Sequence, residues 1–350
     1  MAKLFFLISG EHESLSFSEL KAILEAEGFE YSLTEKLDQT VRLEADENSV
    51  WQVQRRSGYT RVCALELFTC QATDEAIEQA ANATNFKLVL NPTETFAVRI
   101  RRIKEYSSKD QTMKLERKLG KHILQNTNAK VNLKKPDKTF FGILTNHKLV
   151  FGIKLAEIQP KPFVERRPRK KPFFHPSAMN SKLARCMVNL AHAQTGATVL
   201  DPFCGTGTTI IEAKLIGCQT IGIDVQKHAA KGTKQNLAHF GLTAEAVIVA
   251  DARKPPLTQV DCIVTDPPYG RSATTLKAKT SQIVEETLAS AITLLAEGKR
   301  ICIASPKTLN IKTTGEKLGY KHVESHFAYV HRTLTREIAV FQKTCEAKKP

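Results

Sequence analysis

Hydrophobic and polar residues alternate over the first 70 residues in short runs whose spacing predicts strands and helices in turn. The predicted strands are 3–10, 29–35, 40–45 and 60–69, and the predicted helices are 16–28 and 47–58. The resulting βαββαβ order is typical of a ferredoxin-like split βαβ arrangement. We therefore expect a ferredoxin-like N-terminal domain over residues 1–70.

A second α+β pattern follows Pro92. The predicted strands are 95–104, 129–135, 139–146 and 147–157, the last two joined by a turn at Asn146-His147, and a helix is predicted over 110–126. In the first of these strands Val98, Ile100 and Ile103 are interleaved with arginines, so one face is apolar and the other cationic. We assign residues 71–156 to this second domain.

A proline-rich segment follows. The stretch Pro160–Pro176 reads "PKPFVERRPRKKPFFHP" and holds five prolines, each of which lacks a backbone donor and restricts the chain. This composition predicts neither a helix nor the interior of a sheet. We expect residues 157–176 to form a stiff basic linker between domains.

The C-terminal half alternates strand and helix patterns from Ser177 onward. A first helix is predicted from Ser177. The predicted strands are 198–201, 218–225, 246–251, 261–268 and 300–305, the further predicted helices are 208–217, 227–241 and 281–298, and a hairpin is predicted over 322–343. The strands are almost continuously apolar, which is typical of a parallel sheet with helices on both faces. Residues 177–350 are therefore expected to form an α/β, Rossmann-like domain with an antiparallel edge.

Composition places the chain among globular proteins, because 42% of its 350 residues are hydrophobic. The only apolar run near the N-terminus, Phe5 to Ile8, is too short for a secretory or membrane segment. None of the eight cysteines forms a C-x-x-C pair. This usage predicts reduced core thiols in a cytoplasmic protein without a metal site.

Charge is unevenly distributed. Residues 94–175 carry 21 Lys/Arg against 7 Asp/Glu, whereas residues 1–93 carry 8 against 15. This concentration of positive charge indicates a polyanionic partner rather than a role in solubility alone. The candidate phosphate contacts are Arg99, Arg101, Arg102, Lys114, Arg117, Lys118, Lys121, Arg166, Arg167, Arg169, Lys170 and Lys171.

The loop "DPFCGTGTT", Asp201 to Thr209, indicates the class of cofactor. It has two close glycines but Ile210 stands where a dinucleotide loop has its third, and no Gly-Lys-Ser/Thr follows. Asp224 ends the next strand and could accept hydrogen bonds from ribose hydroxyls; Asp251 ends the third and could accept one from an adenine amine. An adenosine ligand without pyrophosphate fits, and S-adenosyl-L-methionine is the candidate.

The turn "TDPPYG" follows the apolar run at 261–264. Two prolines end a strand, so the turn is either a simple terminator or a rigid mount for Asp266 and Tyr269 at the carboxyl edge of the sheet. A rigid mount would hold the Asp266 carboxylate, the Pro267 carbonyl and the Tyr269 ring around a ligand at this edge. The methyl donor is already activated, so no metal is needed.

These motifs resemble the Asp/Asn-Pro-Pro-Tyr signature of class I methyltransferases acting on exocyclic or amide nitrogens. Three segments are together similar to those of the archaeal tRNA (guanine-10-N2)-dimethyltransferase family, namely "FFHPSAMNSKLARCMVNLA", "DPFCGTGT" and "TDPPYG". The resemblance implies a ferredoxin-like domain, an RNA-binding THUMP domain and a class I methyltransferase domain with a mostly parallel seven-stranded sheet. Its implied partner is tRNA, and its implied catalytic residues are Asp266, Pro267, Pro268 and Tyr269.

The same resemblance implies a set of cofactor contacts on the loops that follow the strands. These are His175, Pro176, Asp201, Phe203, Gly205, Thr206, Gly207, Thr208, Thr209, Asp224, Val225, Asp251, Ala252 and Asp266. Related enzymes acting on guanosine 6 of tRNA typically carry Asn in place of Asp266, which favours position 10.

Several alternatives remain open at this point. The substrate could be guanosine 6 of tRNA, an rRNA guanosine, adenine N6 of DNA or glutamine N5 of a protein, or the chain could bind RNA without catalysis. The basic middle segment argues against a protein substrate, and the intact set of acids argues against a loss of catalysis. His322 and His326 are interpreted as ordinary surface residues, and Arg332 and Arg336 either hold the terminal hairpin or touch RNA. The number of methyl groups added and the need for a partner subunit are not determined by these patterns.

Overall fold

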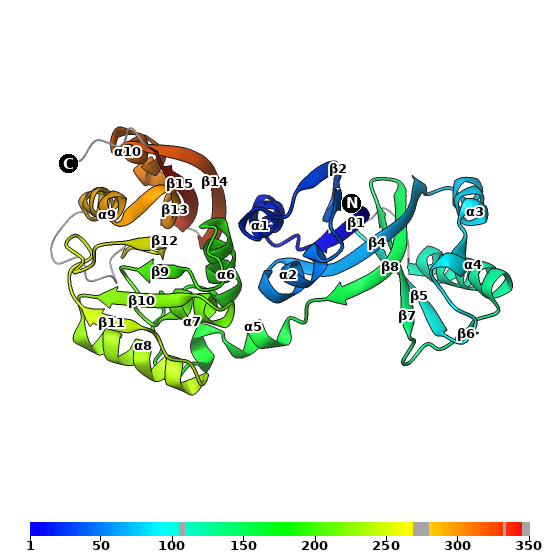
Figure 1. Ribbon diagram of the computed structural model, residues 1–350, viewed down its shortest axis with the longest axis horizontal. Helices are drawn as coiled ribbons and strands as arrows, with labels where there is room; N and C mark the ends of the chain where they lie inside the picture. The colour runs from blue at the N-terminus through cyan, green and yellow to red at the C-terminus, as the bar shows by residue number, and fades with distance from the viewer. Residues whose placement is uncertain (105–108, 269–279, 332–333, 345–350) are drawn as a thin grey trace. The chain divides into compact units, whose positions relative to one another are not determined.

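The computed structural model describes residues 1–104, 109–268, 280–331 and 334–344 (Figure 1). The chain divides into two compact units. The first unit comprises 1–17, 28–55 and 60–159, and the second comprises 18–27, 56–59 and 160–350. The second unit thus includes two short segments from the N-terminal part of the sequence in addition to the expected domain at 177–350.

The first unit is built on one eight-stranded sheet. Its strands are β1 (Ala2–Ile8), β2 (Tyr31–Leu37), β3 (Thr40–Ala45), β4 (Thr60–Gln71), β5 (Thr95–Arg102), β6 (Lys130–Val131), β7 (Lys138–Thr145) and β8 (Lys148–Glu157), in the order β2-β3-β1-β4-β8-β7-β5-β6. β4 pairs antiparallel with β8, so strands from both predicted N-terminal domains share this sheet. The predicted boundary between residues 70 and 71 falls at the end of β4.

The β7–β8 hairpin turns where the sequence predicted it. Asn146 and His147 have φ values of 48° and 57°, which are the left-handed conformations that a two-residue type I′ turn requires. Asn tolerates this region better than most residues, because its short polar side chain can bond nearby backbone. Here Asn146 Oδ1 accepts a hydrogen bond from the amide of Asp38 at 2.8 Å.

Helices α1 (Glu13–Ala26), α2 (Ser49–Arg56), α3 (Asp74–Ala83) and α4 (Lys109–Thr127) accompany these strands. On α4, Leu115, Leu119 and Ile123 recur every four residues and pack into a buried core with Phe140 and Phe151. Sequence reasoning did not predict α3. It buries only two of its side chains, Ile77 and Ala81, so its sequence offers few apolar positions, and Thr73 caps its N-terminus.

The second unit contains a seven-stranded, mostly parallel sheet, which confirms the predicted fold. Its strands are β9 (Thr198–Asp201), β10 (Gln219–Asp224), β11 (Ala246–Val249), β12 (Val260–Thr265), β13 (Leu295–Pro306), β14 (Tyr320–His331) and β15 (Leu334–Lys343), in the order β11-β10-β9-β12-β13-β15-β14. β15 runs antiparallel to both β13 and β14, as the predicted terminal hairpin requires. Because β9, β10 and β12 are parallel, their carboxyl ends lie at one edge of the sheet.

The helices of this unit are α5 (Lys161–Glu165), α6 (Ser181–Leu190), α7 (Thr208–Leu215), α8 (Lys227–His239), α9 (Thr280–Leu294) and α10 (Ile311–Lys317) (Figure 1). The expectation that the proline-rich segment forms no helix was wrong. Pro162 lies in the first turn of α5, where a missing backbone donor costs no hydrogen bond. α6 begins at Ser181 rather than 177, because Asn180 caps it by accepting a bond from the Lys182 amide at 2.9 Å.

Among the residues that the structure describes, no helix combines the length and the hydrophobicity that crossing a bilayer would require.

Candidate functional site

A cavity of about 240 Å³ lies in the second unit at the carboxyl edge of the parallel strands. Most of the predicted cofactor contacts line it, namely His175, Asp201, Phe203, Gly205, Thr206, Thr208, Thr209, Asp224, Val225, Asp251, Ala252 and Asp266. Pro176 and Gly207 are not among the described lining residues, although each adjoins one. The fold therefore brings together side chains that are spread over some 90 residues of sequence.

The loop after β9 is organised by the side chain of Asp201. Asp201 Oδ1 accepts hydrogen bonds from the Phe203 amide at 3.1 Å and from Thr265 Oγ1 at 2.8 Å. The carboxyl is 3% exposed, and burial raises its pKa to about 7. Asp201 therefore joins the end of β9 to the end of β12 as well as lining the cavity.

Asp224 joins the loops after β9 and β10. Its Oδ2 accepts from the Gly205 amide at 3.0 Å and its Oδ1 accepts from the Gln226 amide at 2.8 Å. A carboxylate oxygen can accept more than one hydrogen bond, so these contacts leave acceptor capacity for a ligand's hydroxyls. Burial raises the pKa of Asp224, although both amides oppose the rise.

Gly207 has a steric role next to this site. Its φ is +74°, and a Cβ built on it would lie 2.9 Å from Cγ2 of Thr233 on α8. A side chain at this position would therefore push α8 away from the loop.

Asp251 is bound by an arginine that sequence reasoning missed. Arg253 Nη2 lies 2.6 Å from Asp251 Oδ2, and Arg253 Nε lies 3.0 Å from each carboxylate oxygen. These hydrogen bonds hold the pKa of Asp251 below its usual range. Arg253 also pairs with Glu286 and lines the cavity. The predicted contact between Asp251 and an adenine amine thus competes with, or shares acceptor sites with, the guanidinium.

Asp266 follows the last residue of β12 and lies in the cavity with Pro267 and Pro268. Its Oδ2 is 3.0 Å from Nη2 of Arg336 on β15. The structure thus pairs Arg336 with Asp266. This contact differs from both expectations for Arg336, which were that it holds the terminal hairpin or touches RNA. Tyr269, Gly270 and Arg332 lie outside the described residues.

The interpretation of the two histidines on β14 as surface residues was wrong for one of them. His326 is 5% exposed and lies 3.2 Å from Glu324 Oε2, whereas His322 is partly buried beside Ser325. Alternate residues of β14 face the interior of the unit, and His326 falls on that face.

Two of the predicted phosphate contacts, Lys171 and Arg166, have side chains that bond to buried groups of the second unit. Lys171 is 5% exposed and donates to Thr208 Oγ1 at 2.6 Å, and burial lowers its pKa to about 8. Arg166 forms two hydrogen bonds with the fully buried carboxylate of Glu212, at 2.6 and 3.1 Å. Because of these contacts, Lys171 and Arg166 are largely shielded from solvent, although they belong to the basic segment 157–176.

The other predicted phosphate contacts differ in exposure. The exposed ones are Arg99, Arg101, Arg102, Lys114, Arg117, Lys121, Arg167, Arg169 and Lys170. Lys118 is partly buried and pairs with Glu78 at 3.1 Å. Contact with RNA stays a prediction for all of them.

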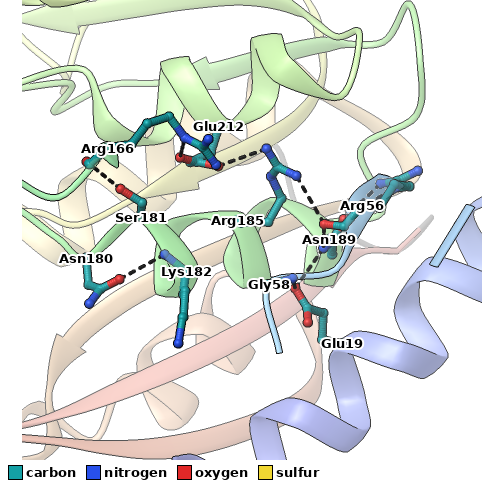
Figure 2. Close-up of polar contacts among 10 residues, drawn as sticks. All are labelled: Glu19, Arg56, Gly58, Arg166, Asn180, Ser181, Lys182, Arg185, Asn189 and Glu212. Carbon is teal, nitrogen blue, oxygen red and sulfur yellow. Dashed lines mark hydrogen bonds and ion pairs between the residues drawn. The ribbon is translucent and has the colours of Figure 1, made fainter. Parts of the chain in front are cut away.

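A buried polar network ties α6 and α7 to the segments 18–27 and 56–59 (Figure 2). Glu19 is fully buried and accepts from Asn189 Nδ2 on α6 and from the Gly58 amide, both at 2.9 Å. Arg185 donates to the carbonyl of Arg56 at 3.2 Å and pairs with Glu212 of α7 at 2.8 Å. The first turn of α7 lines the cavity, so this network helps to position the cavity wall.

The charges of the cavity fit an adenosine that bears a sulfonium. Four aspartates line it, Asp201, Asp224, Asp251 and Asp266, together with two arginines, so acids outnumber cations and the cavity favours a cationic ligand. Apolar side chains such as Phe203, Val225 and Ile283 offer surfaces for an adenine ring. No group of three or more potential metal ligands occurs within the described ranges. The residues present therefore suit S-adenosyl-L-methionine.

Comparison with protein families supports this assignment. Residues 168–337 match the model of the RMKL-like methyltransferase domain, and residues 39–235 match a model described as DNA methylase. The second match ends before the Asp266 turn, so it includes no residue of the proposed amine-binding site.

Solved structures share the fold. TrmN from Thermus thermophilus has a TM-score of 0.52 and 22% identity, covering 97% of this chain and 99% of its own. A methyltransferase complexed with SAH, SMU.472, has a TM-score of 0.56 and 13% identity, covering 98% of each chain.

Among curated proteins, the chain is 37% identical to the tRNA (guanine(10)-N2)-dimethyltransferase of Methanothermobacter thermautotrophicus, with 97% of this chain and 99% of that protein covered. It is 32% identical to the protein of the same name from Methanocaldococcus jannaschii, again with 97% and 99% covered. The chain belongs to the tRNA (guanine(10)-N2)-dimethyltransferase family and carries its class I S-adenosylmethionine-dependent methyltransferase fold.

Proposed function

We propose that this protein transfers methyl groups from S-adenosyl-L-methionine to the exocyclic N2 of guanosine 10 in tRNA. Relatives of that name align with nearly the whole chain. The observation that carries the proposal is the position of Asp266 and Pro267 in the same cavity as Asp224 and the loop at 201–209. An acceptor pair for an amine thus adjoins the groups suited to the cofactor.

The turn activates a weak nucleophile by orienting it. The lone pair of the guanine amine is delocalised into the ring, so the free base attacks poorly. Asp266 and the carbonyl of Pro267 would accept hydrogen bonds from the two amine hydrogens and direct the lone pair toward the reacting carbon. The carboxylate also stabilises the positive charge that develops on nitrogen.

When bound, the cofactor supplies an electrophilic methyl group on a sulfonium. Asp224 and the loop at 201–209 would hold the cofactor in the same cavity as Asp266 and Pro267, which would hold the amine. The nitrogen would lose one proton as it gains the methyl group, and Asp266 would accept a hydrogen bond from that proton until it passes to solvent. Tyr269 is proposed to stack on the flipped base.

The first unit is proposed to bind tRNA. Residues 1–70 would be the ferredoxin-like domain and 71–156 the THUMP domain, followed by the basic segment 157–176. Exposed arginines on β5 and exposed basic residues on α4 support phosphate contacts there. A tRNA substrate is consistent with a cytoplasmic location, and the transfer requires no metal.

The test is an assay with labelled S-adenosyl-L-methionine and unmodified tRNA, followed by digestion to nucleosides. We expect N2-methylguanosine or N2,N2-dimethylguanosine from normal tRNA, and no label in a transcript with adenosine at position 10. A time course distinguishes one methyl from two. Label only in DNA, in protein or at guanosine 6 would contradict the proposal.

A further inference from the structure

Arg336 approaches the amine-binding turn from a distant part of the chain. It lies on β15, where its backbone is in register with Pro306 at the end of β13. Nη2 of Arg336 is 3.0 Å from Oδ2 of Asp266, and the two side chains are only 10% and 17% exposed. Both residues line the cavity, so this ion pair belongs to the site and is not a surface contact.

A second acid close to Asp266 increases the need for a cation at this place. Asp201 is buried nearby, and the negative charge of Asp266 is among the causes that raise the pKa of Asp201. Two neighbouring carboxylates in a region of low dielectric oppose each other's ionisation. A cation in contact with Asp266 offsets both this repulsion and the loss of hydration.

The other charged groups of the cavity are differently placed. Arg253 forms an ion pair with Asp251, and Asp224 accepts hydrogen bonds from two backbone amides. His175 and His228 also line the cavity, and His175 Nδ1 lies 2.7 Å from Ser177 Oγ. Arg336 differs from these groups because its guanidinium forms an ion pair with Asp266.

We propose that Arg336 is a positioning residue for methyl transfer: it holds Oδ2 of Asp266 so that the carboxylate is oriented toward the amine and its negative charge has a counter-charge. The inference rests on the proposed function. The arginine is needed only when residue 266 is Asp, because a buried carboxylate needs a counter-charge whereas a neutral Asn does not. The effect of Arg336 should therefore depend on the residue at position 266.

The experiment is a double-mutant cycle in the full-length protein with Arg336→Met, Asp266→Asn and both together. Single-turnover rates at saturating tRNA and cofactor report the transfer step, and equilibrium binding of SAH and of tRNA reports the ground state. We expect Arg336→Met to lower the rate about 100-fold, as loss of an electrostatic group in an active site commonly does. The dissociation constants of SAH and of tRNA should change less than about 3-fold.

The cycle separates action through Asp266 from a general structural effect. In the Asp266→Asn background, Arg336→Met should lower the rate by no more than about 3-fold, because the charge that it compensates is gone. Arg336→Lys should recover at least about 10-fold of the loss seen with Met, because it restores the positive charge. If Arg336→Met does not fold, Arg336→Gln replaces it in the cycle, since Gln keeps a donor without the charge.

Arg300→Met is the matched control. Arg300 lies on β13 of the same sheet, has a side-chain exposure of 16% and contacts Glu25 and His192, but does not line the cavity. Its loss should leave the rate within about 3-fold of the wild type. Unchanged transfer in Arg336→Met, or fully additive losses in the double variant, would overturn the inference. An inactive wild-type protein would instead overturn the proposed function.

Discussion

Lys171 donates to Oγ1 of Thr208 at 2.6 Å from a position that is 5% exposed. Thr208 is the first residue of α7 and lines the cavity, so the end of the basic segment packs behind the cofactor loop. The arrangement requires a lysine to be buried, and burial lowers its pKa to about 8. This has a measurable consequence for stability.

Replacing Lys171 by Met should stabilise the protein most at neutral pH. The pKa of Lys171 is about 8 in the folded state and 10.5 as a reference, so the unfolded chain binds more protons between these values. The free energy of unfolding of the wild type therefore rises with pH across that window, relative to Lys171→Met. The difference in the free energy of unfolding between Lys171→Met and the wild type should narrow by about 2 kcal/mol from pH 7.5 to 9.5, measured by urea denaturation.

The neighbouring Lys170 provides the control, because it is exposed. Lys170→Met should show no such dependence on pH. A constant difference between Lys171→Met and the wild type over the same range would contradict the burial of Lys171.

Asp266→Ala should abolish transfer while leaving both substrates bound. The alanine removes the acceptor for the amine but none of the contacts that organise the loop at 201–209. We expect a rate at least about 1,000-fold below the wild type and SAH affinity within about 3-fold. Quench-flow rates and equilibrium dialysis measure these; substantial residual transfer would exclude Asp266 as the amine acceptor.

Binding of tRNA should depend steeply on salt. If the exposed arginines and lysines of β5 and α4 contact phosphates, the logarithm of the association constant falls linearly with the logarithm of salt concentration. Replacing Arg101 and Lys121 by Gln should reduce that slope by about 2, because each contact releases about one counterion. Filter binding of the full-length protein over a salt series measures it, and a slope equal to that of the wild type would remove these two residues from the interface.

Loss of Arg185 should destabilise the second unit. Arg185 is 4% exposed and links the Arg56 carbonyl to Glu212 of α7 (Figure 2). Arg185→Met leaves a buried carboxylate with one fewer cation, for which we expect a loss of about 3 kcal/mol in the free energy of unfolding. Chemical denaturation measures this.

Lys182→Met on the same helix is the comparison, because the Lys182 side chain points away from Arg185 and Glu212 in Figure 2. It should change the free energy of unfolding by less than about 0.5 kcal/mol. Equal losses in the two variants would show that the network contributes nothing specific.

Local pattern was sufficient for much of the site. The apolar runs that end at Asp201 and Asp224, and the run that precedes Asp266, predicted parallel strands, and parallel strands necessarily place their carboxyl ends at one edge. Hence the place of the cavity and the acids that line it could be predicted from the pattern, whereas most of its other lining residues were expected only from the resemblance to a known family. Of the elements that were missed, α3 and α10 are short helices that each bury only two residues, and α5 has a proline in its first turn.

The sequence by itself determined which acids face the cavity, because strand ends and turn prolines are local properties. Only the tertiary structure decided which cations meet them. Arg336 reaches Asp266 because β15 inserts between β13 and β14, and Lys171 is buried because its segment packs against α7. Ion pairing depends on distance and burial, and neither is encoded in the spacing of residues that lie 37 or 70 positions apart.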